Sequence, residues 1–184
     1  MSPVPLLFLG VDGTVVTGQP SPLRTPDAAR KHMRNAAPAG PVWFRPGVVE
    51  RLNSMVDDEL VEPIWLTARG DAAPAVLAPA IGLHGQDWPA PRMPLNAGLL
   101  PSAPTRHPIA RHLWWKTQAV LSRTRDGRAF LWVDDEIDTS ARNTLRALRQ
   151  QPSLVLVPRT GTGMTMEHLA AIERFVAVRA QVAA

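Results

Sequence analysis

Residues 5–14 read PLLFLGVDGT, and this stretch decides the fold. The apolar run from Pro5 to Val11 is continuous, which is typical of a parallel strand that is buried on both faces. The turn-forming residues Asp12, Gly13 and Thr14 follow at once. The stretch therefore predicts a buried strand that is followed by a polar loop.

Three more apolar segments repeat this pattern. They are residues 61–66 (VEPIWL), 128–133 (RAFLWV) and 153–157 (SLVLV). Helices are expected at residues 46–58, 71–79, 109 or 114–123, 139–150 and 165–182, with Asp71 and Thr165 as caps. Strands that alternate with helices predict an α/β protein with a doubly wound parallel sheet, in a single domain covering residues 1–184.

Two proline-rich segments lack a sustained period. Residues 15–45 predict an irregular flap or minimal cap, with a short helix near 27–34. Residues 84–108 predict a long irregular excursion, which follows a short strand at 81–83. Neither segment is long enough for a full second domain.

Charge and composition narrow the function classes. The net charge is +4 and the sequence pI is about 10.9, but 18 of the 20 basic residues are arginine, which inflates the pI. Basic residues are scattered. Arg142, Arg146 and Arg149 share one face of an expected helix, either as a solvated face or as a phosphate-contacting face. Nucleic-acid binding is therefore the less favoured partner class.

The residue types that are missing are also informative. The absence of cysteine excludes disulfides and thiolate chemistry. No apolar run approaches the length that spans a bilayer, and the first residues lack the pattern of a signal peptide. We expect a cytoplasmic protein that does not associate with a membrane.

Polar residues stand just after the expected strands. Asp12, Thr67, Asp134 and Asp135 each follow an apolar run. Ligands of open α/β sheets bind outside the carboxyl ends of the strands, where such residues converge. We therefore expect these side chains to share one rim.

Four segments resemble the motifs of the haloacid dehalogenase-like (HAD) phosphohydrolases, whose sheet is Rossmann-like. Residues 8–14 (FLGVDGT) resemble the first motif, a strand followed by Asp-x-Asp-Gly-Thr, and residues 65–67 (WLT) resemble the second. Lys116 resembles the lysine of the third. Residues 131–135 (LWVDD) resemble the fourth, with its paired acids.

The resemblance implies a role for each matching residue. Asp12 would act as the acid and base, with its backbone carbonyl facing Mg²⁺. Thr67 would bind a phosphoryl oxygen, and Lys116 would neutralise negative charge. Asp135, Asp134 or both would hold Mg²⁺. Gly13, Thr14 and Arg69 are expected to contact the substrate together with Thr67.

Gly10 stands where the family carries its nucleophilic aspartate. Neither strand propensity nor expected packing accounts for a glycine there. Three explanations are open: a pseudo-enzyme that keeps its phosphate pocket, a variant of an aspartate enzyme, or altered chemistry through Asp12 or an Asp135-bound water. We expect a phosphohydrolase scaffold that is inactive or strongly impaired, so enzyme status is open. The alternatives are a non-catalytic module that binds a phosphorylated ligand or a protein, and a protein that binds nucleic acid or processes its ends.

The sequence indicates the class of substrate more weakly than it indicates the fold. A site with little or no cap suits a large or macromolecular phosphate ester, although a small phosphorylated molecule also fits. Arg24, Arg45 and Arg69 are candidates for substrate contacts. Trp43 and Trp88 are expected either in the core or at the pocket. The other singled-out side chains, His84, His107 and His112, are not spaced as metal ligands.

Overall fold

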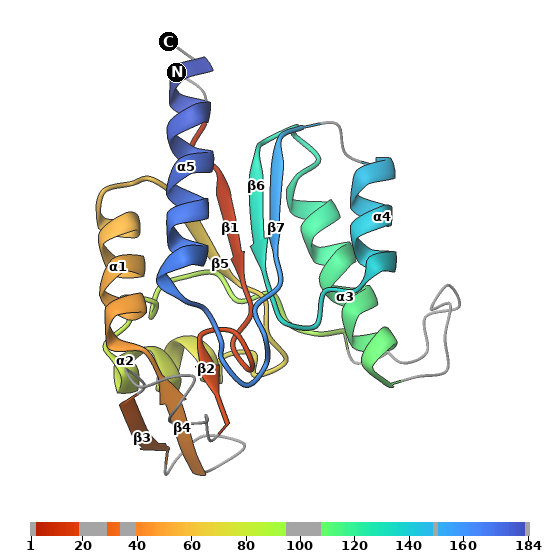
Figure 1. Cartoon of the computed structure of the whole chain (residues 1–184). Coiled ribbons are helices and arrows are strands. Elements are labelled where there is room, and N and C mark those ends of the chain that lie inside the picture. Colours follow the sequence, from red (N-terminus) through yellow and green to blue (C-terminus); the bar gives the residue numbers. More distant parts are fainter. Residues whose placement is uncertain (1–2, 19–28, 34–39, 95–107, 149–150, 183–184) are drawn as a thin grey trace.

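The computed structural model describes residues 3–18, 29–33, 40–94, 108–148 and 151–182. Its centre is a four-stranded parallel sheet in the order β5-β1-β6-β7 (Figure 1). The strands are β1 (Leu6–Leu9), β5 (Glu62–Trp65), β6 (Phe130–Val133) and β7 (Ser153–Leu156). They are the four strands that the apolar segments predict, with shorter bounds.

Helices cover both faces of this sheet, as Figure 1 shows. On one face, α1 (Pro46–Asp57) packs beside α5 (Met166–Val182), and an ion pair joins Arg51 to Glu173. On the other face, α3 (Pro108–Arg123) packs beside α4 (Thr139–Leu148). The predicted α/β class, with a parallel sheet between helices, is confirmed.

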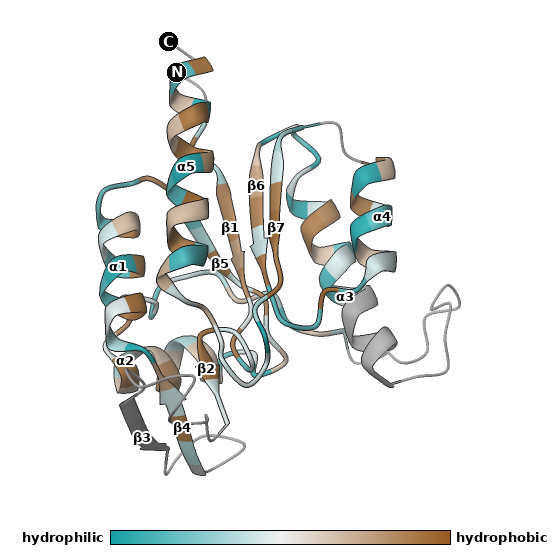
Figure 2. Ribbon diagram, in the orientation of Figure 1, coloured by the Kyte–Doolittle hydropathy of each residue, from teal (hydrophilic) through white to brown (hydrophobic). Residues whose placement is uncertain are grey.

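Successive residues of the central strands point into two different cores. Leu7 and Leu9 pack with α1 and α5, whereas Leu6 and Phe8 pack with α3 and α4. Figure 2 accordingly shows the middle strands in brown, the apolar colour. Pro63 lies in β5, an edge strand, where a residue without an N–H group is tolerated.

Residues 15–45 differ from the expected irregular flap. Strands β2 (Val16–Thr17), β3 (Ala29–Met33) and β4 (Gly40–Phe44) form an antiparallel sheet in the order β2-β4-β3. This small sheet lies beside the carboxyl ends of the parallel strands (Figure 1). The helix expected near 27–34 is wrong where the structure describes it, because all five residues of β3 pair with β4. Strand pairing of this kind overrides weak local propensity.

The helix expected at residues 71–79 is present, but its type, its cap and its end differ from the prediction. A π-helix, η1 (Ala73–Leu77), continues directly into α2 (Ala78–Ile81), and the strand expected at 81–83 is absent. Asp71 does not cap this helix; its side chain binds Arg92. Residues 84–94 are irregular as predicted, and residues 95–107 lie outside the described ranges.

Candidate active site

Three parallel strands bring the predicted polar residues to one rim. The loop of Asp12 follows β1, Thr67 follows β5, and Asp134 with Asp135 follows β6. The register pairs Leu9 with both Trp65 and Val133, so the three loops begin level with one another. The Gly10 N–H group then donates to the Val133 carbonyl at 2.8 Å, which extends the ladder into the rim.

Lys116 reaches this rim from α3 and binds two acids. Its Nζ lies 2.8 Å from Asp134 Oδ2 and 2.9 Å from Glu136 Oε2. The side chains of Lys116 and Asp134 are 6% and 1% exposed. Burial alone would lower the pKa of Lys116, but the charges and hydrogen bonds of Asp134 and Glu136 outweigh burial and raise this pKa above its ordinary 10.5. Lys116 is therefore a charged group at neutral pH.

Gly10 lies directly against this ion pair. A Cβ atom at position 10 would lie 2.6 Å from Asp134 Oδ2 and 3.0 Å from Thr14 Oγ1. The first of these distances is shorter than real Cβ contacts, so a side chain here would require the Asp134 carboxylate to shift. The expectation that packing does not account for Gly10 is therefore wrong. The Asp134 carboxylate fills the space that a side chain would occupy.

Asp135 packs against the loop that follows β1. Its N–H group donates to Thr14 Oγ1 at 3.2 Å, and its carboxylate lies too close to Gly13 for any Cβ atom to fit. Gly13 also has a φ of +69°, which favours glycine. Burial raises the pKa of Asp135, although a hydrogen bond from Thr160 opposes this shift. Gly13 is thus explained by its contact with Asp135, whether or not a substrate touches it.

Asp12 and Arg69 form a bidentate ion pair. Arg69 Nε lies 2.9 Å from Asp12 Oδ2, and Arg69 Nη2 lies 2.6 Å from Asp12 Oδ1. The hydroxyl of Thr67, a buried residue, accepts the backbone N–H of Arg69 at 3.2 Å. Asp12 thus uses both carboxylate oxygens to bind Arg69, and Thr67 holds the backbone beneath that arginine.

The Mg²⁺ expected at Asp134, Asp135 and the Asp12 carbonyl stays a prediction. Magnesium requires several oxygen ligands in octahedral geometry. Here Asp134 is bound to Lys116, Asp135 is turned over Gly13, and Gly10 offers no side-chain oxygen. Within the described ranges, no three His, Asp or Glu side chains are placed to hold a metal ion. The donor set as arranged therefore does not fit Mg²⁺.

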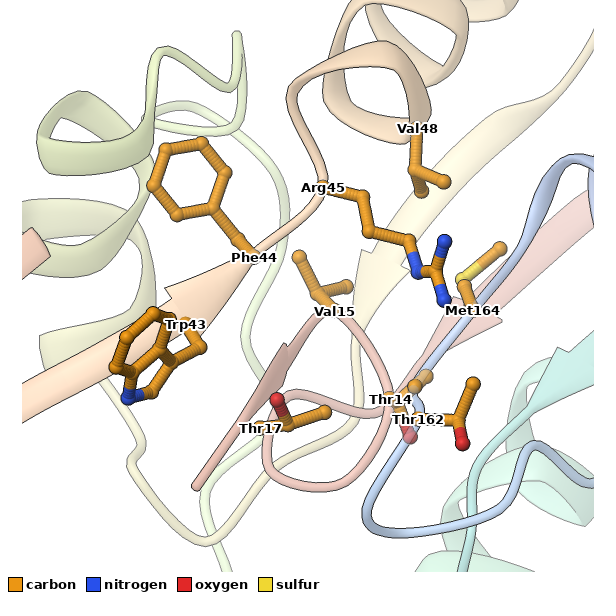
Figure 3. Close-up of a pocket in the computed structure, with 10 residues that line it drawn as sticks. Thr14, Val15, Thr17, Trp43, Phe44, Arg45, Val48, Thr162 and Met164 are labelled. Carbon is orange, nitrogen blue, oxygen red and sulfur yellow. The ribbon is translucent and has the colours of Figure 1, made fainter. Parts of the chain in front are cut away.

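Three of the predicted contact residues, Arg45, Trp43 and Thr14, line a separate small hollow. Arg45 and Trp43 surround it together with Thr14 and Thr162, and Figure 3 shows Arg45 extending toward Met164. Thr14 therefore borders both the rim and this hollow. Arg24 lies outside the described residues.

The other singled-out residues lie away from the rim. Trp88 is 7% exposed and packs on Trp65 with ring centres 4.9 Å apart, so it is a core residue. His84 is exposed and lies 3.4 Å from Asp57 Oδ1. Arg142 and Arg146 are exposed on α4, and their contact with nucleic acid stays a prediction. His107, the side chain of His112 and Arg149 are outside the described part.

Two contacts at the rim were not foreseen from the sequence. Glu136 binds Lys116, and Thr160 hydrogen-bonds to Asp135. Glu136 directly follows the two predicted acids, so the run Asp-Asp-Glu carried a usable signal. Thr160 had no signal beyond its place after the last strand.

Comparison with models of known protein families, with curated proteins and with solved structures gave no match to this chain. The HAD resemblance therefore rests on the four sequence motifs alone. Among the helices in the described ranges, none is both long enough and apolar enough to cross a bilayer.

Proposed function

We propose that this chain has the scaffold of a HAD-type phosphohydrolase and binds phosphomonoesters at the rim, but lacks the covalent route to hydrolysis. One observation carries the proposal. A side chain at position 10 would project onto the Asp134–Lys116 pair, with its Cβ 2.6 Å from Asp134 Oδ2. In the resembled family, the nucleophilic aspartate occupies this position beside a lysine and an acid.

The groups around position 10 suit a phosphoryl ligand. Lys116 and Arg69 are cations at the rim, each paired with acids of the chain itself, and arginine binds phosphate oxygens with two parallel hydrogen bonds. Thr14 and Thr67 supply hydroxyl groups. These residue types support binding of a phosphate ester more directly than binding of an apolar ligand.

The remaining acids are poor substitutes for the missing nucleophile. Asp134 is 1% exposed and is bound to Lys116, so its carboxylate cannot approach a phosphorus atom from solvent. Asp12 is exposed, but it lies two residues beyond position 10, in the loop after β1, where it contacts Arg69 and does not occupy the place of a carboxylate at position 10. In a serine protease, loss of the covalent nucleophile costs about 10⁶-fold in rate. We therefore expect no turnover through an aspartyl-phosphate in the chain as it stands.

Restoring the carboxylate tests the proposal. We expect Gly10→Asp to release phosphate from p-nitrophenyl phosphate, assayed with and without MgCl₂, at least about 10³-fold faster than the chain with Gly10. Gly10→Ala is the matched control, because it adds the same Cβ beside Asp134 without a nucleophile. A second control, Gly10→Asp combined with Lys116→Met, should lose the restored rate.

Two results would contradict the proposal. The first is that Gly10→Asp hydrolyses none of a broad panel of phosphate esters, although its circular dichroism spectrum matches that of the unsubstituted chain. The second concerns the unsubstituted chain. Calorimetry that detects no binding of p-nitrophenyl phosphate to this chain would contradict the proposal.

A further inference from the structure

Arg69 has an unusual environment for a residue at the edge of a site. Its side chain is only 6% exposed, whereas the side chain of its partner Asp12 is 62% exposed. The guanidinium is thus built into the protein, and the carboxylate that covers it faces water. Of the two partners, Asp12 is the one that can move away, because water can solvate its carboxylate while another anion takes its place on Arg69.

The guanidinium also has an unused donor. Its Nη1 nitrogen is buried and has no hydrogen-bond partner among the described residues. Buried donors are almost always paired, so such a group calls for an explanation. Nη1 lies on the opposite side of the guanidinium carbon from the Nε–Nη2 edge, so an anion that replaces Asp12 would bind that edge alone and leave Nη1 unpaired.

The backbone holds Arg69 in place whether or not Asp12 is bound. The Arg69 N–H group donates to Thr67 Oγ1 at 3.2 Å, and Thr67 is buried directly after β5. Asp12 lies in the turn after β1, where it forms an isolated bridge with Val16. A rotation of the Asp12 side chain would free the fork without disturbing either strand.

We infer that Arg69 is an oxyanion-binding residue, and that Asp12 is a tethered occupant which a phosphoryl ligand must displace. The carboxylate of Asp12 stands in for two ligand oxygens on Nε and Nη2. Planar bidentate recognition of this kind selects phosphate and similar oxyanions. This inference rests on the proposed function, because it takes the rim as a phosphate site. It adds that Arg69 recognises the anion and that the Asp12–Arg69 contact weakens binding.

Calorimetric titration with inorganic phosphate tests this inference. Asp12→Asn keeps the size of the side chain but removes its charge, so we expect phosphate to bind at least about fivefold more tightly, the lower end of typical coupling between linked sites. Asp71→Asn is the matched control. Asp71 is 65% exposed, is bound to another arginine, Arg92, and lies two residues from Arg69. It should change the affinity less than about twofold, since it removes the same charge without freeing the fork.

A second readout assigns the binding to one of the 18 arginines. The Nε–H resonance of Arg69 should shift on phosphate addition, and Arg69→Lys should lose the extra affinity of Asp12→Asn. Equal or weaker phosphate binding by Asp12→Asn would overturn the inference, as would full binding by Asp12→Asn combined with Arg69→Lys. These results are independent of the hydrolysis assay on Gly10→Asp, so either idea can fail without the other.

Discussion

At position 116 a buried ammonium group stands between two carboxylates. Lys116→Met would leave Asp134, at 1% exposure, without its counter-charge. Removing one partner of a buried pair costs about 3–5 kcal/mol. We expect a loss of that size in the free energy of unfolding measured by urea denaturation.

Replacing both members of the pair should be far less harmful. Lys116→Met combined with Asp134→Asn removes the stranded charge, so most of the lost stability should return. A single Lys116→Met variant that loses less than about 1 kcal/mol would show that the pair does not hold the rim together.

Single residues also show how far the sequence could predict the site. Asp12, Thr67, Asp134 and Asp135 could be placed at one rim because each follows an apolar strand, and parallel strands end together. Their partners could not be predicted. Whether an exposed acid such as Asp12 binds Arg69 or Lys116 depends on side-chain rotamers, which sequence spacing does not determine.

Among the elements, α5 carries a histidine in its first turn, His168, whose side chain hydrogen-bonds to Thr165, the residue before the helix. Nδ1 of His168 accepts the Thr165 N–H group at 3.1 Å and lies 2.9 Å from Thr165 Oγ1. Burial lowers the pKa of His168 below its ordinary 6.5; Arg45 adds to this shift and Glu167 opposes it. Protonation at Nδ1 would remove the acceptor, so the predicted cap at Thr165 depends on a neutral imidazole.

Stability should respond to acid in a defined direction. Because the folded pKa of His168 is lowered, its contribution is fully present above pH 6.5 and is lost as the pH falls through the lowered value. Between pH 7 and pH 5, we expect the Tm of His168→Gln to fall by about 1–2 °C less than the Tm of the unsubstituted chain. The exposed His84→Gln serves as the control. An unchanged pH profile in His168→Gln would show that the cap does not titrate.

The elements differ in how readily the sequence predicts them. β1 and β6 are buried on both faces, so their sequences are continuously apolar and easy to recognise. The sheet β2-β4-β3 was missed because β3, with the sequence ARKHM, has no alternating pattern. The residues Val42, Trp43 and Phe44 in β4 favour a strand, but Gly40 and Pro41 before them suggest a loop.

On the scale of the whole molecule, the parallel sheet separates two cores. Leu52 on α1 belongs to one, and Leu145 on α4 belongs to the other. If the chain is one domain, Leu52→Ala and Leu145→Ala should each lower the free energy of unfolding by about 2–4 kcal/mol. For each variant, tryptophan fluorescence and far-ultraviolet circular dichroism should give coincident unfolding curves.

Non-coincident curves would instead mean that the helices on one face unfold separately from the sheet. The double variant adds a further check. The two sites lie in different cores, so their effects should sum to within about 0.5 kcal/mol.

The close approach of Gly10 and Asp134 makes these two positions interdependent in any sequence change. A side chain at position 10 fits only if the Asp134 carboxylate moves away, and the ion pair with Lys116 holds that carboxylate in place. We expect substitutions at position 10 to be tolerated better once residue 134 is shortened, because the oxygen that would lie 2.6 Å from the added Cβ is then absent. A library that aims to change the activity of this chain should therefore vary positions 10 and 134 together.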